Sequence, residues 1–156
     1  IMETTLVILK PSSIQRALAG KILSRFEQKG LRIAGLKMMM LDENLLREHY
    51  AHLVDRPFFP SLILSMTATP VIVAAISGVE AVQTVRQMTG ATNSRKALPG
   101  TIRGDFSMSG QENVIHASDS PENAAIELAR FFCPEELYDY SLISTPSLYA
   151  PDELTR

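Results

Sequence analysis

Histidine is the side chain best suited to nucleophilic or acid–base chemistry near neutral pH, and the sequence contains three: His49, His52 and His116. His116 ends a short apolar run and is followed by Ser118 and Asp119, at an expected junction between a strand and a helix. Functional sites in sheet proteins often form at such junctions. A structural histidine at a sheet edge fits the same local context, so this pattern alone leaves both interpretations open.

The segment after His116 favours a functional role for it. Residues 121–132 predict a helix with a narrow polar stripe of Asn123, Glu127 and Arg130, so we expect this helix to be covered on most sides. Glu127 has two possible roles. It can pair with Arg130 at i,i+3, which is worth roughly 0.2–0.5 kcal/mol, or it can orient the imidazole of His116, as a third group orients the base in a nucleophile relay.

The other two histidines have a simpler interpretation. His49 and His52 lie three residues apart beside Arg47 and Glu48, in a segment with helical spacing of its apolar residues. This pattern is typical of a solvated helical face. We therefore expect neither His49 nor His52 to take part in a functional site.

A loop rich in glycine, threonine and cations predicts an anion site. Residues 90–112 show no sustained period, and loops of this length inside a compact domain are usually functional or disordered. Guanidinium, hydroxyl and exposed backbone N–H groups are the donors that phosphoryl oxygens require. The loop offers such donors at Thr92, Asn93, Arg95, Lys96, Thr101, Arg103 and Gly104. We expect Lys10 and Arg86 to converge with this loop around a phosphate; a solvated charged loop is the alternative.

Several familiar phosphate and metal motifs are absent from the sequence. There is no Walker A loop around Gly20 and Lys21, no GxGxxG, and no carboxylate cluster or Cys/His spacing typical of a metal site. We therefore expect no metal held by protein side chains. Any Mg²⁺ should arrive on the phosphates of a nucleotide, because this ion prefers water and phosphate oxygens.

Length and composition indicate one soluble domain spanning residues 2–156. The chain has 156 residues, 46% hydrophobic and 21% charged, with a net charge of −2. This charge argues against a protein that binds mainly to nucleic acid or anionic membranes. The single cysteine, Cys133, excludes a disulfide scaffold, and neither a signal peptide nor a membrane span is recognisable. We expect a cytoplasmic location.

The pattern of apolar residues predicts an α+β fold. Strands are expected at 5–10, 32–41, 71–76 and 113–117, and helices at 17–29, 42–53, after Pro57, at 79–88 and at 121–132. This order fits the ferredoxin-like class, a β-α-β-β-α-β antiparallel sheet covered by helices, with a long loop and a C-terminal tail in addition.

Residues 113–120 closely resemble the N-x-x-H-G-S-D active-site motif of nucleoside diphosphate kinases. Further segments similar to this family occur in order along nearly the whole chain, at 5–11, 15–16, 25–27, 48–50, 56–59, 90–93 and 99–105. The resemblance implies transfer of the γ-phosphoryl group of a nucleoside triphosphate to a nucleoside diphosphate, by a ping-pong route through a phosphohistidine, with Mg²⁺ carried by the nucleotide.

The resemblance also implies a role for each site residue. His116 would be the nucleophile, oriented by Glu127 and Ser118. The phosphates would be held by Arg86, Thr92 and Arg103. Lys10 and Asn113 would contact the ribose hydroxyls and phosphate, Tyr50 would support Lys10, and the base would lie against Phe58 and Leu62. Few polar contacts to the base would account for tolerance of different bases.

Three positions differ from the family pattern. Ala117 replaces the usual glycine after the histidine, Gly110-Gln111-Glu112 replaces a frequent V-G-R stretch, and Ser94 stands where proline is common. A Glu112 side chain that pointed into the phosphate pocket would weaken anion binding. Ser94 bears on assembly, because family oligomers pack their subunits through this loop.

The resemblance implies a homo-oligomer, with a hexamer first and a tetramer next. The apolar tail, residues 134–149, resembles the tail that packs on a neighbouring subunit in hexameric members. Two other functions are weighed against the kinase. One is a nucleotide-binding regulatory module of the same fold with little turnover, and the other is nucleic-acid binding, against which the net charge argues.

Overall fold

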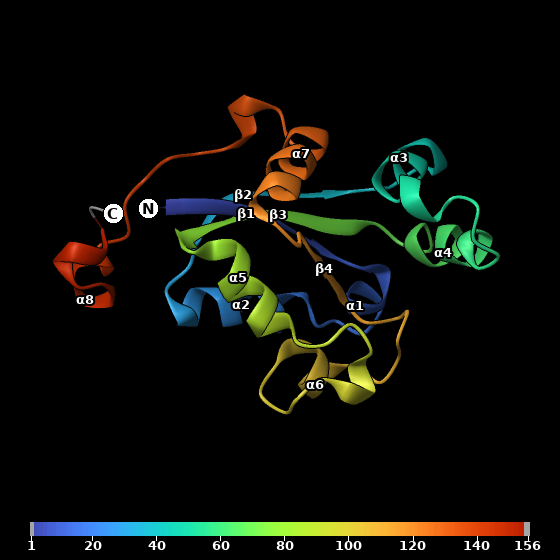
Figure 1. The fold of residues 1–156 in the computed structure, drawn as a ribbon, viewed down its shortest axis with the longest axis horizontal. Coiled ribbons are helices and arrows are strands. Elements are labelled where there is room, and N and C mark those ends of the chain that lie inside the picture. The colour runs from blue at the N-terminus through green and yellow to red at the C-terminus, as the bar shows by residue number, and fades with distance from the viewer. Residues whose placement is uncertain (1, 155–156) are drawn as a thin grey trace.

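A computed structural model describes residues 2–154 and contains a four-stranded antiparallel sheet with the strand order β2-β3-β1-β4 (Figure 1). The strands are β1 Met2–Leu9, β2 Arg32–Met39, β3 Val71–Val79 and β4 Ile115–Ala117. Strand β1 lies at the centre and pairs with both β3 and β4. The predicted α+β class and antiparallel sheet are therefore confirmed.

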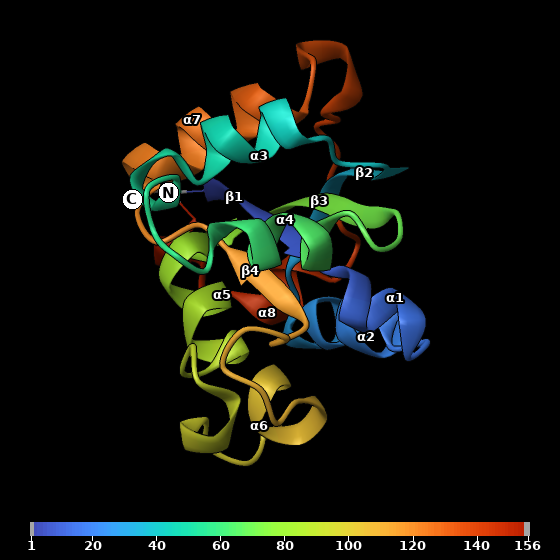
Figure 2. The same cartoon turned by 90° about the vertical axis from the view of Figure 1, so that its right-hand side faces the viewer.

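Helices cover both faces of this sheet. They are α1 Pro11–Gln15, α2 Ala19–Lys29, α3 Glu43–His49, α4 Phe59–Met66, α5 Ala81–Thr89, α6 Ile102–Phe106, α7 Pro121–Phe131 and α8 Thr145–Leu148. Helices α2, α5 and α6 lie on one face, and α3 and α7 lie on the other, with α4 at the end of the sheet beside α3 (Figures 1 and 2).

Strand β1 contributes to two hydrophobic cores because its side chains alternate between the faces. Val7 and Leu9 belong to the core under α2 and α5, whereas Leu6 and Ile8 belong to the core under α3 and α7. All four are fully buried. This confirms the prediction from the apolar run that the first strand is buried on both faces.

Several predicted elements have other bounds in the structure, among them the helix at 17–29 and the loop at 90–112. The expected helix at 17–29 begins at Ala19 and follows the separate short helix α1, because Ala17 adopts a left-handed conformation with φ 55°. The loop at 90–112 is not structureless. It contains a 3₁₀ turn, Ser94–Lys96, and α6, whose N-terminus is capped by the Thr101 side chain.

The C-terminal tail packs on its own chain. Leu148 contacts Gly30, where a Cβ atom would lie 2.5 Å from the leucine Cδ2, and the Tyr149 hydroxyl accepts a hydrogen bond from Val79 N. The tail nevertheless leaves the Ile143 side chain fully exposed.

Helix α7 is more exposed than the sequence predicts. Its Ile126 side chain is 56% exposed. The expectation that the helix at 121–132 is covered on most sides is therefore wrong for the single chain. No helix among residues 2–154 is long and apolar enough to cross a membrane.

Candidate active site

A cavity of about 350 Å³ opens at the edge of the sheet beside β4. It brings together most of the residues predicted for the site: Lys10, Tyr50, Arg86, Thr92, Arg103, Asn113, His116 and Glu127. Ser118 is fully buried behind the wall of this cavity. The elements that supply these side chains are far apart in the sequence, so the cavity depends on the whole fold.

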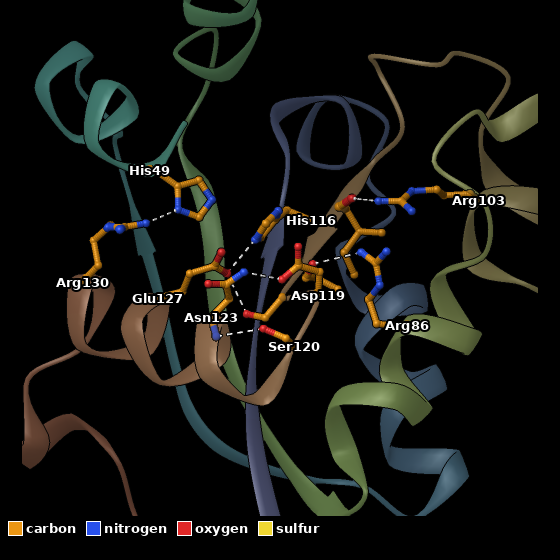
Figure 3. Close-up of polar contacts among 12 residues, drawn as sticks. His49, Arg86, Arg103, His116, Asp119, Ser120, Asn123, Glu127 and Arg130 are labelled. Atoms are coloured by element: carbon orange, nitrogen blue, oxygen red, sulfur yellow. Dashed lines mark hydrogen bonds and ion pairs between the residues drawn. The ribbon is translucent and has the colours of Figure 1, made fainter. Parts of the chain in front are cut away.

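The imidazole of His116 is held by helix α7. His116 lies on β4 opposite Ile8 of the central strand, and the Ser120 side chain caps α7 by accepting from Asn123 N. Two turns into this helix, Glu127 Oε1 lies 2.8 Å from His116 Nε2 and 2.7 Å from Ser118 Oγ (Figure 3). Two roles were possible for Glu127, and the structure contains its contact with His116. Arg130, the alternative partner, contacts His49 and Glu48 instead.

These contacts fix the proton positions on His116. Burial acts to raise the pKa of Glu127, but the contacts with His116 and Ser118 outweigh it and hold that pKa well below its usual value. The carboxylate is therefore ionised at neutral pH and accepts from both neighbours. A neutral His116 then carries its proton on Nε2, which leaves the lone pair on Nδ1 free.

Arg103 is bound to the backbone around the cavity. It is 5% exposed, and it donates to the carbonyl oxygens of Asn113 at 3.2 Å, Gly90 at 3.0 Å and Ile115 at 2.6 Å. Burial and the charge of Arg86 lower the pKa of Arg103 to about 10, so it remains charged at neutral pH. Within residues 2–154, the Arg86 side chain makes a single hydrogen bond, of 3.4 Å, from Nη1 to the Ala117 carbonyl (Figure 3).

The contacts of Arg103 flank a strained residue. Val114 has φ 63°, a left-handed conformation that is unfavourable for a β-branched side chain. Arg103 holds the carbonyls on either side of Val114, and the Val114 carbonyl accepts from Lys10 N at 2.9 Å. This clamp overcomes the local strain and fixes the backbone that leads from Asn113 to His116.

Lys10 and Asn113 form a pair at the other end of the cavity. Lys10 Nζ donates to Asn113 Oδ1 at 2.7 Å, and Asn113 Nδ2 donates to the Thr92 carbonyl at 2.9 Å. Burial and the charge of Arg103 lower the pKa of Lys10 to about 8, which the Glu112 carboxylate opposes. Within residues 2–154, Tyr50 makes no hydrogen bond to Lys10, and it packs edge-on against His49. Burial raises the pKa of Tyr50, so its hydroxyl stays protonated.

His49 is the main residue that the sequence analysis missed. It is buried, not solvated, and its ring meets that of His116 edge-to-face, with centroids 4.7 Å apart. Arg130 Nη1 lies 2.8 Å from His49 Nδ1. His52 is exposed, as predicted, although it lines the outer part of the cavity. Helical periodicity placed both histidines on one helix but carried no information about the strand that meets it.

His49, His116 and Glu127 form a cluster of potential metal ligands, with ligand atoms within 4.8 Å of one another. Arg130 argues against metal binding there. A guanidinium can only donate, so His49 Nδ1 accepts, and the proton of the neutral ring lies on Nε2. Both nitrogens of His49 are therefore occupied, and the cations of the cavity also oppose a bound dication.

Of the three departures from the family pattern, only Ala117 lines the cavity, where its carbonyl accepts from Arg86. The Glu112 carboxylate accepts from Ser65 Oγ of α4 at 2.5 Å, so it is tied to that helix. Ala117 is buried, and Ser94 Oγ bonds Ser107 Oγ at 2.8 Å in the loop. Phe58 is 45% exposed beside α4 and Leu62 is nearly buried; neither lines the cavity.

Comparison with known proteins gives a consistent result. The family model described as nucleoside diphosphate kinase matches residues 3–137. A nucleoside diphosphate kinase of Parabacteroides distasonis is 58% identical over 97% of this chain and 99% of its own length, and one of Rhodopirellula baltica is 49% identical over 97% and 100%. The structure of a halophilic nucleoside diphosphate kinase from Halobacterium salinarum in complex with CDP aligns with a TM-score of 0.93 and 41% identity, covering 96% of this chain and all of that one.

Proposed function

Because the chain belongs to the nucleoside diphosphate kinase family and has nucleoside diphosphate kinase activity, we propose that it transfers the phosphoryl group through His116. The observation that carries this proposal is the contact of Glu127 with His116 Nε2 at 2.8 Å. It leaves Nδ1 unprotonated inside a cavity that also contains Arg86, Arg103 and Lys10. A nucleophile and phosphate-binding cations therefore share one cavity.

In the first half-reaction, the Nδ1 lone pair attacks the γ-phosphorus in line. The bond from this phosphorus to the bridging oxygen breaks, and its electron pair leaves with the nucleoside diphosphate. The ionised Glu127 stabilises the positive charge that develops on the imidazole, and Ser118 keeps the carboxylate in place. In the second half-reaction a phosphate oxygen of the acceptor attacks the same phosphorus, and the N–P bond breaks.

The cations hold the nucleotide. Arg86 is the freer guanidinium, so it can turn its donors to the transferred group, while Arg103 contributes charge and its remaining N–H groups. Thr92, Lys10 and Asn113 hold the phosphates and ribose hydroxyls, with Tyr50 packed beside them. The base lies against the half-exposed Phe58 beside α4, beyond the lining of the cavity, and Leu62 supports that surface.

Mg²⁺ fits this site as a companion of the nucleotide. The walls of the cavity carry Lys10, Arg86 and Arg103, and its ionised acids are few, so the donor set suits phosphate oxygens better than a resident dication. Carried on the phosphates of the nucleotide, Mg²⁺ would neutralise negative charge during the transfer.

Three further assignments belong to this proposal. Residues 2–156 act as one domain, of which 155 and 156 lie outside the described residues. The active form is a homo-oligomer, a hexamer first and a tetramer next, which the exposed apolar side chains of the tail and of β2 support. The protein is expected to work in the cytoplasm.

The experiment is an incubation with γ-labelled ATP and Mg²⁺ without an acceptor. We expect label on the wild-type protein that is stable in base, labile in acid and discharged by GDP, and none on His116→Ala. Label on His116→Ala, or no label on folded wild-type protein that binds nucleotide, would contradict the proposed nucleophile. The second result would favour a binding module.

A further inference from the structure

The contact between Glu127 and His116 leaves one degree of freedom of the imidazole poorly restrained. The Cβ–Cγ axis passes between Cε1 and Nε2, so Nε2 lies nearer to this axis than Nδ1 does. Rotation of the ring about that bond therefore moves Nδ1 farther than it moves Nε2. Because this torsion has broad minima in histidine, a hydrogen bond at Nε2 alone does not aim Nδ1.

His49 covers the imidazole on another side. Its ring lies edge-to-face with that of His116 at an interplanar angle of 76°, with centroids 4.7 Å apart. His49 is itself enclosed by Tyr50, at 4.7 Å between centroids, and by Phe131, at 5.2 Å. A buried ring packed in this way restrains the rotation that the Glu127 contact leaves open.

Arg130 sets the orientation of His49. Its Nη1 donates to His49 Nδ1 at 2.8 Å, and the opposite side of the His49 ring faces His116 (Figure 3). Glu48 pairs only loosely with Arg130, because its Oε1 lies 3.4 Å from Arg130 Nε and makes no hydrogen bond to it, and only 13% of the Arg130 side chain is exposed. Burial, followed by the neighbouring His116 and Arg130, lowers the pKa of His49 well below its ordinary value, so this ring stays neutral.

We propose that Arg130 and His49 form a positioning pair for the nucleophile. Arg130 fixes the tautomer and tilt of His49, and the His49 ring fixes the rotation of His116, so that Nδ1 faces the phosphate end of the cavity. Glu127 and Arg130 lie one turn apart on α7, so a single helix restrains the nucleophile in two ways. Neither member of the pair exchanges protons with the substrate. The proposal rests on the proposed function of His116.

The first test compares Arg130→Met, which keeps an apolar stem but loses the donor, with Arg130→Lys, which keeps a donor. Glu48→Gln is the matched control, because it removes the exposed charge beside Arg130 and leaves His49 untouched. The readouts are the rate of His116 phosphorylation at saturating ATP, the half-saturating ATP concentration, and the imidazole tautomers by ¹⁵N NMR.

We expect Arg130→Met to lower the saturated phosphorylation rate by about 10-fold, with less than about a twofold change in half-saturation. Its His49 should change from a single Nε2–H tautomer to a mixture of both. Arg130→Lys should recover most of the rate, and Glu48→Gln should match the wild type. An unchanged rate in Arg130→Met, or the same loss in Glu48→Gln, would overturn the proposal.

A second pair of variants separates positioning from proton transfer. His49→Phe keeps a ring against His116, whereas His49→Ala removes it. We expect His49→Phe to phosphorylate several times faster than His49→Ala; equal rates would contradict a role through packing. If the wild type took no label at all, the proposed nucleophile would be wrong, and a mixed His49 tautomer in the wild type would separately refute the Arg130 contact.

Discussion

The two walls of the cavity hold their functional groups in different ways. On the wall formed by β4 and α7, His116 is restrained by side chains, with Glu127 and Ser118 on one side and His49 on another. On the opposite wall, Arg103 is restrained by three backbone carbonyls, and Arg86 is almost unrestrained. Substitutions on the first wall should therefore change the chemical step. On the second wall, Arg103 should affect folding and Arg86 should affect binding.

The largest expected effect is that of Arg103→Lys. Lysine keeps the charge but cannot satisfy three carbonyls from one planar group, and the strained Val114 would lose its clamp. We expect the free energy of unfolding to fall by about 3 kcal/mol and turnover to fall by more than about 100-fold. Chemical denaturation and steady-state assays measure both. Unchanged stability with weaker nucleotide binding would mean that Arg103 acts only as a phosphate ligand.

Glu127→Gln tests the first wall. The amide cannot balance the charge that develops on the imidazole and no longer selects the Nε2–H tautomer. We expect phosphorylation at saturating ATP to slow by about 10- to 100-fold, with half-saturation unchanged, in stopped-flow or quenched-flow measurements. Ser118→Ala should show a smaller loss of the same kind. If only the half-saturating ATP concentration changed, Glu127 would act in nucleotide binding and not in the chemical step.

Arg86→Lys is the counterpart of the Arg103 substitution. Arg86 has one long contact within the described chain, so its replacement leaves no buried group without a partner. We expect stability to change by less than about 0.5 kcal/mol and the half-saturating nucleotide concentration to rise by about 10-fold. A loss of stability equal to that of Arg103→Lys would remove the distinction between the two arginines.

The smallest expected effect is on the fall of kcat/KM at alkaline pH. The pKa of Lys10, lowered to about 8, means that its charge is present below this pH and is lost above it, so kcat/KM should fall as the pH rises through about 8. Glu112 acts to raise this pKa, so Glu112→Gln should move the fall to lower pH. Bound phosphates favour the charged lysine, and kcat should therefore respond less. A pH profile that is identical in Glu112→Gln would contradict this coupling.

Much of the fold could be predicted because its patterns are local. The fully buried β1, the cap of α7 at Ser120 and the end of α2 at Gly30 each depend on a few adjacent residues. The predicted ends of helices and strands were wrong where the backbone conformation depends on residues far away in the sequence. Strand β1 begins at Met2 because β3 pairs with it along its whole length, and the turn at Ala17 requires an unusual backbone conformation.

The site was predictable in its residue types, and the structure brings Lys10, Arg86 and Arg103 together in one cavity, as the family resemblance implied. The family motif pointed to His116 as the proposed nucleophile, and the spacing of Glu127 and Arg130 placed both on one side of α7. Partners between distant segments were not predictable. His49 on α3 meets His116 on β4 only through the packing of α3 and α7, and Glu112 meets Ser65 of α4, 47 residues away in the sequence.

The most direct test of this account is to identify the nitrogen that carries the phosphoryl group. Protein uniformly labelled with ¹⁵N is phosphorylated by ATP and Mg²⁺ and studied by ³¹P and ¹⁵N NMR under alkaline conditions that preserve phosphohistidine. Because Glu127 occupies Nε2, we predict phosphorus on Nδ1 of His116. Phosphorus on Nε2 would contradict the geometry from which the mechanism is derived.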